Sequence, residues 1–115
     1  MRSALEAAAV RVGPSMNAQE VANTLWALAT LGWHAAGAGP MRSALEAAAV
    51  RVGPSMNAQD VANTLWALAT LGWQAGTGPM RSALEAAAVR VGPSMNAQDV
   101  ANTLWALATL GWQDG

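Results

Sequence analysis

One block of sequence occurs three times in this chain. The copies cover residues 1–33, 41–73 and 80–112. They differ at a single position, which is Glu20 in the first copy and Asp in the other two, and their starts are 40 and then 39 residues apart. Tandem repeats with a period of about 20–50 residues are typical of solenoids, in which each unit buries its apolar face against the next. We therefore predict one repeat domain of three units, residues 1–40, 41–79 and 80–115.

The first half of each block has the pattern of a short amphipathic helix. Its apolar residues follow the i, i+3, i+4, i+7 spacing of one helical face: Leu5, Ala8, Ala9 and Val12. Ser3 followed by Glu6 predicts a capping box at the start of this helix. In the later copies Pro40 and Pro79 are an alternative start, because Pro suits the first helical position. Gly13-Pro14 ends the helix, since Gly adopts the left-handed conformation and Pro cannot continue the hydrogen-bond ladder.

The second half of each block predicts a longer helix that is more deeply packed. Asn17 is the expected N-cap, and the acidic residue three positions later completes a capping box. No charged residue occurs between Val21 and Leu31, so we expect this helix to be packed on several sides. Gly32 fits the left-handed residue that follows a helix, and Trp33 then packs back on the last turn. The repeats together predict an all-α solenoid of six helices, antiparallel within each helix-turn-helix pair.

The composition argues against several classes of function. Cys is absent, and the one His, His34, is replaced by Gln74 and Gln113 in the other copies. We therefore expect no catalytic residue, no metal site and no cofactor, because nucleophile–base pairs and zinc sites need more such side chains. The net charge of −1 lacks the basic footprint of a nucleic-acid-binding domain.

The uncharged stretches of the chain do not resemble membrane helices. The longest stretch without Asp, Glu, Arg or Lys, residues 21–41, contains Gly and Pro residues that break or burden such a helix. The absence of Cys fits a reducing compartment. We therefore expect a soluble intracellular protein with no membrane partner.

Two Arg positions and one Asn position in each block are the candidates for binding. An Arg at the start of a helix gains nothing from the helix dipole, so binding and plain solvation are its two explanations. An Arg in the last turn already has a dipole explanation. If both Arg positions line one surface, they form a ladder that can follow a phosphate backbone. The Asn either reads a base edge or binds the backbone of a neighbouring repeat. The candidates are Arg2, Arg42, Arg81, Arg11, Arg51, Arg90, Asn23, Asn63 and Asn102.

The six Trp residues fall into two sets. Those at the border of the second helix's apolar stripe are Trp26, Trp66 and Trp105. We expect them in the core, because burying an aromatic side chain is strongly stabilising, and base stacking is the alternative. Those that follow the second helix are Trp33, Trp73 and Trp112, and we expect them to pack against it rather than to bind a ligand.

The most specific segment is Val-Ala-Asn-Thr-Leu-Trp-Ala-Leu-Ala-Thr-Leu-Gly, at residues 21–32, 61–72 and 100–111. Each copy follows Asn-Ala-Gln-Glu or Asn-Ala-Gln-Asp. The segment resembles the octotricopeptide repeat family and its heptatricopeptide relatives, whose Asn-x-Leu-Trp-Ala-Leu core matches in all copies. The resemblance covers essentially the whole chain. It implies helix-pair repeats of organellar proteins that bind single-stranded RNA and act in transcript maturation, stability or translation. The segment is also similar to helical repeats of bacterial effectors delivered into plant cells, which implies protein interaction.

The sequence thus leaves three functions open. The first is single-stranded RNA binding, sequence-tolerant or modular; in the modular form identical repeats prefer identical bases. The second is a protein-interaction scaffold, effector-like or armadillo-like, favoured by the nearly neutral charge. The third is self-assembly, because the outer copies lack the polar capping sequences of solenoids and predict end-to-end association or a dimer through one end. The near-identity of the copies fits a recent duplication, a designed consensus array or a piece of a longer array.

Overall fold

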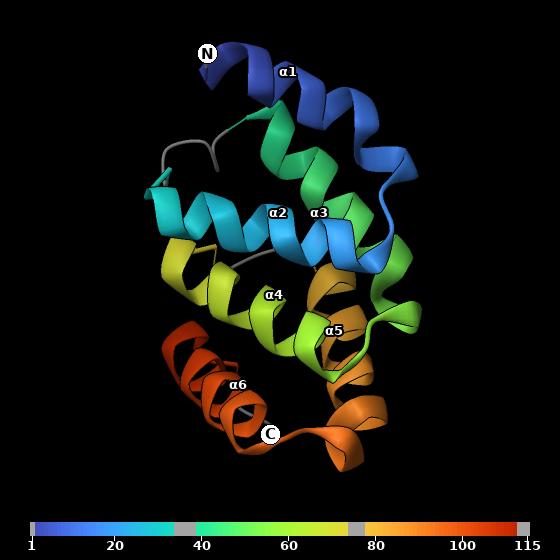
Figure 1. The fold of residues 1–115 in the computed structure, drawn as a ribbon, viewed down its shortest axis with the longest axis vertical. Coiled ribbons are helices and arrows are strands. Elements are labelled where there is room, and N and C mark those ends of the chain that lie inside the picture. The colour runs from blue at the N-terminus through green and yellow to red at the C-terminus, as the bar shows by residue number, and fades with distance from the viewer. Residues whose placement is uncertain (1, 34–38, 74–77, 113–115) are drawn as a thin grey trace.

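The computed structural model describes residues 2–33, 39–73 and 78–112, and within these ranges the predicted six-helix, all-α repeat fold is confirmed (Figure 1). The first helices of the repeats are α1 (Arg2–Val12), α3 (Pro40–Val52) and α5 (Gly78–Val91). The second helices are α2 (Ala18–Leu31), α4 (Ala58–Leu71) and α6 (Ala97–Leu110). Short 3-10 turns join them: η1 (Gly13–Ser15), η3 (Gly53–Ser55) and η4 (Gly92–Ser94). No helix in the described part is both long and apolar enough to cross a membrane.

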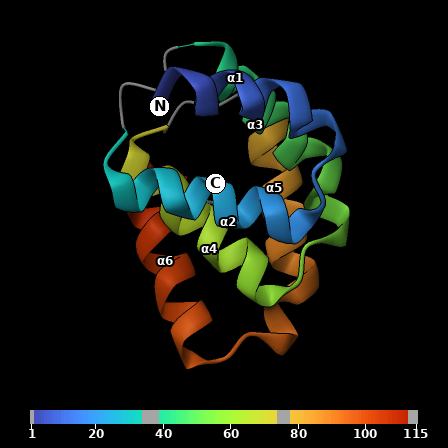
Figure 2. The same cartoon turned by 45° about the horizontal axis from the view of Figure 1, so that its top comes forward.

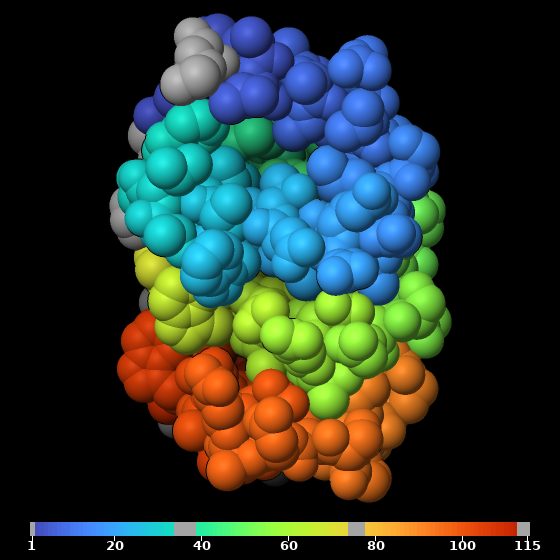
Figure 3. Space-filling view, viewed as in Figure 1, coloured from blue at the N-terminus to red at the C-terminus, as the bar shows by residue number. Residues whose placement is uncertain are grey.

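The helices form two layers that follow the long axis of the molecule (Figures 1 and 2). α2, α4 and α6 pack side by side along their lengths, whereas α1, α3 and α5 contact one another less extensively. The second helices therefore form a closely packed layer, and the first helices form a looser one. The molecule measures 39 × 25 × 24 Å, and Figure 3 shows the repeats as successive bands.

The repeats interlock, so that the core lies between them. The two helices of one repeat hardly touch, and each second helix packs instead on the first helix of the following repeat: α2 on α3, and α4 on α5. In Figure 3, α3 is visible at the floor of the furrow that separates α1 from α2. A repeat therefore has no core of its own and depends on its neighbours, as expected for a solenoid.

The second helices begin and end as predicted. Asn17 Oδ1 accepts the N–H of Glu20 at 2.8 Å, and the Glu20 carboxylate accepts the N–H of Asn17 at 2.9 Å. The same capping box occurs in α4 and α6. Gly32 is left-handed, with φ 73°, and the N–H of Trp33 donates to the Leu28 carbonyl at 3.1 Å. This is the Schellman geometry expected at the end of the helix.

The predicted capping box of Ser3 and Glu6 is wrong. α1 already includes Arg2, so Ser3 lies inside the helix, and the Glu6 carboxylate pairs with the Arg2 guanidinium. Opposite charges four residues apart meet on one helical face, which draws the carboxylate away from the helix start. α3 begins at Pro40 without a side-chain cap, which confirms the alternative start. Pro79 lies likewise in the first turn of α5.

The glycine that follows the first helix is not left-handed, contrary to prediction. Gly53 has φ −47°, and a positive φ occurs, within the described ranges, only at Gly32, Gly72 and Gly111. The following Pro is therefore sufficient to end the first helix, because it has no N–H to donate. The glycine lies instead at a close approach between repeats. A Cβ built on Gly13 would be 3.6 Å from the Cβ of Ala44, in ordinary van der Waals contact with α3.

Candidate functional site

The second helices present an uncharged stripe to solvent. α4 is covered on both sides, and its residues that are not buried are Gln59, Asn63, Trp66 and Thr70. Their spacing of i, i+4, i+7 and i+11 places them in one line along the helix. The equivalent residues of the outer repeats are Gln19, Asn23, Trp26, Thr30, Gln98, Asn102, Trp105 and Thr109. We call these twelve residues the amide–tryptophan face.

The expected core position of the first Trp set is wrong for the outer repeats. The side chains of Trp26 and Trp105 are 46% and 48% exposed, and Trp66 is half-buried. Leu25 and Leu28 occupy the centre of the apolar stripe and leave the neighbouring Trp at its border. The ring centroids of Trp26 and Trp66 are 6.4 Å apart, with 33° between the ring planes, within the range of an aromatic pair.

The candidate Asn residues lie one helical turn before these Trp residues. Asn23 is exposed, and Asn63 and Asn102 are half-buried. Within the described part of the chain, none of the three side-chain amides forms a hydrogen bond, so the alternative of a bond to a neighbouring backbone is not realised there. Each amide keeps two N–H donors and one carbonyl acceptor for a ligand.

The first Arg of each repeat lies over a Trp ring, at the edge where the second helices end. The Cζ-to-centroid distances are 4.8 Å for Arg2 and Trp33, 5.1 Å for Arg42 and Trp73, and 5.5 Å for Arg81 and Trp112. The same guanidiniums pair with the carboxylates of Glu6, Glu46 and Glu85 at 3.2, 2.9 and 3.1 Å. Each Arg therefore joins the start of the first helix to the end of the second by a cation–π contact. The charge is largely compensated by the adjacent carboxylate.

The second Arg of a repeat binds the backbone of the preceding repeat. Arg51 Nη2 donates to the carbonyls of Gly13 and Met16 at 2.9 and 2.6 Å. Arg90 Nη2 donates to the carbonyls of Gly53 and Met56 at 3.0 and 2.7 Å. We call this contact the Arg clamp. It gives these residues an inter-repeat role that the dipole explanation did not include.

The two Arg positions do not form one ladder. Arg2 is the first residue of α1 and Arg11 lies in its last turn, so the two rows lie at opposite edges of the array. The packed positions expected for the second Trp set are confirmed, since Trp73 and Trp112 are 1% and 6% exposed and Trp33 packs partly against the core. Sequence reasoning missed the Gln and Thr residues of the amide–tryptophan face. Their signal is the recurrence of uncharged polar residues at helical spacing on an otherwise apolar helix.

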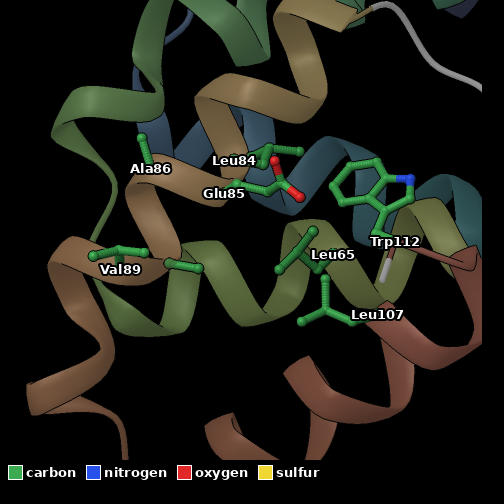
Figure 4. Close-up of a pocket in the computed structure, with 8 residues that line it drawn as sticks. Leu65, Leu84, Glu85, Ala86, Val89, Leu107 and Trp112 are labelled. Atoms are coloured by element: carbon green, nitrogen blue, oxygen red, sulfur yellow. The ribbon is translucent and has the colours of Figure 1, made fainter. Parts of the chain in front are cut away.

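An apolar groove opens between α4, α5 and α6, with a volume of about 310 Å³ (Figure 4). Leu65, Leu84 and Leu107 contribute one side chain from each helix, and Glu85 and the Trp112 ring lie at the same opening. Among the described residues, no three His, Asp or Glu side chains form a group that could hold a metal.

Three segments of the chain match one family model. Residues 13–25, 53–65 and 92–104 match a family described as "Protein of unknown function (DUF1601)". Each match runs from the 3-10 turn into the second helix and includes the carbonyls of the Arg-clamp position and the Asn of the amide–tryptophan face. No curated protein and no solved structure matches the chain. The comparisons therefore support a helical tandem repeat.

Proposed function

We propose that this chain is a non-enzymatic module that binds single-stranded RNA on the amide–tryptophan face. One observation carries the proposal: every repeat places a side-chain amide with no hydrogen bond beside an exposed or half-buried indole, on the same helical layer. Helical-repeat proteins read single-stranded bases with two or three side chains per repeat, and aromatic rings stack on the bases. Amides at Asn23, Asn63 and Asn102 are suited to the donor and acceptor edges of bases.

The Trp residues supply stacking in this proposal. Stacking of a base on an aromatic side chain contributes about 1–3 kcal/mol. Trp26 and Trp66 are already within pairing distance, so the bases stack on the outer ring surfaces rather than between the two rings. The exposed parts of Trp26 and Trp105 at the two ends of the row are the first points of contact.

Phosphate contacts have a smaller role. The row of Arg2, Arg42 and Arg81 has partly exposed side chains, and its guanidiniums are paired with carboxylates. The net charge of −1 adds no long-range attraction for an anionic strand. With at most three phosphate contacts, the slope of log K against log salt for a single strand is no steeper than about −2. The binding is therefore dominated by the bases.

The test is fluorescence anisotropy of the chain with labelled poly-A, poly-C, poly-G and poly-U oligomers, each over a salt series. Because the repeats are nearly identical, we expect one homopolymer to bind best, with a shallow salt dependence. Equal binding to all four would exclude a modular code. The absence of binding at low salt would contradict the proposal.

A protein ligand is the second candidate function. It is favoured by a face that carries no charged side chain and exposes Trp26 and Trp105, because Trp is enriched and charge is depleted at the centres of protein interfaces. Pull-down from a lysate with and without nuclease separates the two candidates. A partner that survives nuclease favours the scaffold, and one that is lost with nuclease favours RNA.

A further inference from the structure

The exposed large apolar side chains are confined to the outer repeats. Among the described residues they are Leu5, Val10, Trp26, Leu31, Val89, Val100, Leu104 and Trp105, and none of these belongs to repeat 2. Apart from the two Trp residues of the amide–tryptophan face, these side chains are candidates for two unpartnered end surfaces. Their counterparts in the other repeats show what normally covers them.

The end surface of repeat 3 corresponds to the side of α2 and α4 that contacts the next repeat. Leu104 on α6 is 62% exposed, whereas its counterparts Leu25 and Leu65 are 1% and 0% exposed. Val100 is 42% exposed, and its counterpart Val61 is fully buried. The end surface of repeat 3 is therefore the same surface that an internal repeat buries against its successor.

The end surface of repeat 1 is the complementary one. Leu5 on α1 is 51% exposed, whereas Leu45 and Leu84 are fully buried at the same position against the preceding repeat. Leu31 is 61% exposed, and its counterpart Leu71 is 4% exposed. Repeat 1 therefore presents the surface that an internal repeat buries against its predecessor.

The groove at the end of the array lies where the first helix of a following repeat would pack. α2 packs on α3 and α4 packs on α5, whereas the described chain contains no further first helix for α6. The groove lies at this position, between α4, α5 and α6, and its lining includes Leu84, Val89 and Leu107 (Figure 4). In repeat 2, Leu68, the counterpart of Leu107, is fully buried. The fitting occupant is thus α1 of another copy.

Each end of the array also contains one partner of the Arg clamp without the other. Within the described residues, Arg11 forms no hydrogen bond or ion pair, although its counterparts each bind two carbonyls. No described guanidinium reaches the corresponding carbonyls of Gly92 and Met95. A Cβ built on Gly92 would meet nothing within 4 Å, whereas one on Gly53 would lie 3.5 Å from the Cβ of Ala83. The guanidinium at one end thus matches, at the other end, a pair of carbonyls equivalent to those that the Arg clamp binds inside the array.

We propose that a second copy of this chain docks head to tail, with its repeat 1 on repeat 3 of the first copy. The contacts repeat those of the internal interfaces: Leu5 enters the groove, and Arg11 clamps the carbonyls of Gly92 and Met95. The Arg clamp sets the direction, because a head-to-head pair would leave both Arg11 side chains without acceptors. Because the docked copy continues the stacking of repeats along the long axis, the head-to-tail contact does not close into a ring, and the product is an open chain that lengthens with concentration. This inference does not depend on RNA binding.

The test uses one variant for each end. Leu5→Glu blocks the end of repeat 1, and Leu104→Glu blocks the end of repeat 3; both positions are exposed in the monomer, so both variants should fold. In sedimentation-velocity experiments on nuclease-treated protein, we expect wild type to lengthen with concentration and each variant alone to be monomeric. An equimolar mixture of the two variants should form a discrete one-to-one dimer, because each supplies the end that the other lacks.

Three results would overturn the proposal. These are a wild-type chain that stays monomeric at all concentrations, a mixture of variants that forms no dimer, and dimerisation of either variant alone. The matched controls are Ser3→Glu and Ser82→Glu, at a position exposed in every repeat, and both should associate like wild type. Arg11→Gln should raise the dissociation constant about tenfold or more, because two charge-assisted hydrogen bonds are lost. The stability of the monomer should not change.

Discussion

Repeats 2 and 3 have the same sequence over residues 41–73 and 80–112, but different environments. Leu65 is fully buried on the side of α4 that faces the following repeat, and its counterpart Leu104 is 62% exposed. α4 is buried except for its stripe, whereas α6 exposes a second, apolar side. Burial in this protein is therefore a property of the neighbouring repeat, and the same residue is core in one copy and exposed surface in another.

The equivalent Arg residues of different repeats also differ in their polar contacts. Arg51 and Arg11 are equivalent in sequence, and Arg51 binds two carbonyls of the preceding repeat. Arg11, at the start of the array, forms no such contact within the described residues. The effect of an inter-repeat contact on the free energy of unfolding can therefore be measured by substituting one residue, with the equivalent residue of another repeat as an internal control.

The largest difference is expected for Leu65→Ala against Leu104→Ala. Leu65→Ala should lower the free energy of unfolding by about 2–5 kcal/mol, because it leaves a cavity among buried side chains. Leu104→Ala should change it by no more than about 0.5 kcal/mol in the monomer, since the side chain is exposed. Urea denaturation at low protein concentration measures both. Equal losses would show that the end of the array is covered in solution.

A smaller difference is expected for Arg51→Gln against Arg11→Gln. Loss of two hydrogen bonds from a charged donor should destabilise the Arg51→Gln monomer by about 1–3 kcal/mol. Arg11→Gln should leave the urea midpoint unchanged. If the two variants melt alike, the Arg clamp does not contribute to the stability of the array.

The smallest effect concerns a buried hydroxyl. Thr64 is fully buried in α4, and its Oγ1 has no hydrogen-bond partner among the described residues. Thr64→Val replaces this hydroxyl with a methyl group of similar shape and should raise the free energy of unfolding by up to about 1 kcal/mol. Thr24→Val, at the half-buried equivalent position in α2, should have less effect. A loss of stability in Thr64→Val would indicate that a water molecule satisfies the hydroxyl.

Local signals predicted most of the fold. The capping box at Asn17 and the Schellman ending at Gly32 join residues no more than five positions apart, so a short stretch of sequence contains both partners. The prediction was wrong for Ser3 and Glu6, because a competing local partner, Arg2, binds the carboxylate. Helix number and type followed from apolar periodicity, which does not require knowledge of the neighbours.

The candidate site was predictable only in part. Asn23 and Trp26 were identified as residues of interest, but whether each was core or surface depended on which sides of the second helix the neighbouring helices cover. The carbonyls bound by Arg51 lie 35 and 38 residues earlier in the chain, a separation that no local pattern reports. Contacts of this kind arise from the stacking of repeats, and they became visible only in three dimensions.

The most direct test of the proposed function is the RNA anisotropy titration repeated with two triple variants. One is Asn23→Ala, Asn63→Ala and Asn102→Ala on the amide–tryptophan face. The other is the control Ser3→Ala, Ser43→Ala and Ser82→Ala, at exposed positions of the first helices. We predict that the Asn variant loses the preference for one homopolymer while its urea midpoint stays close to wild type, and that the Ser variant binds like wild type. An Asn variant that keeps both the affinity and the base preference of wild type would contradict the assignment of this face.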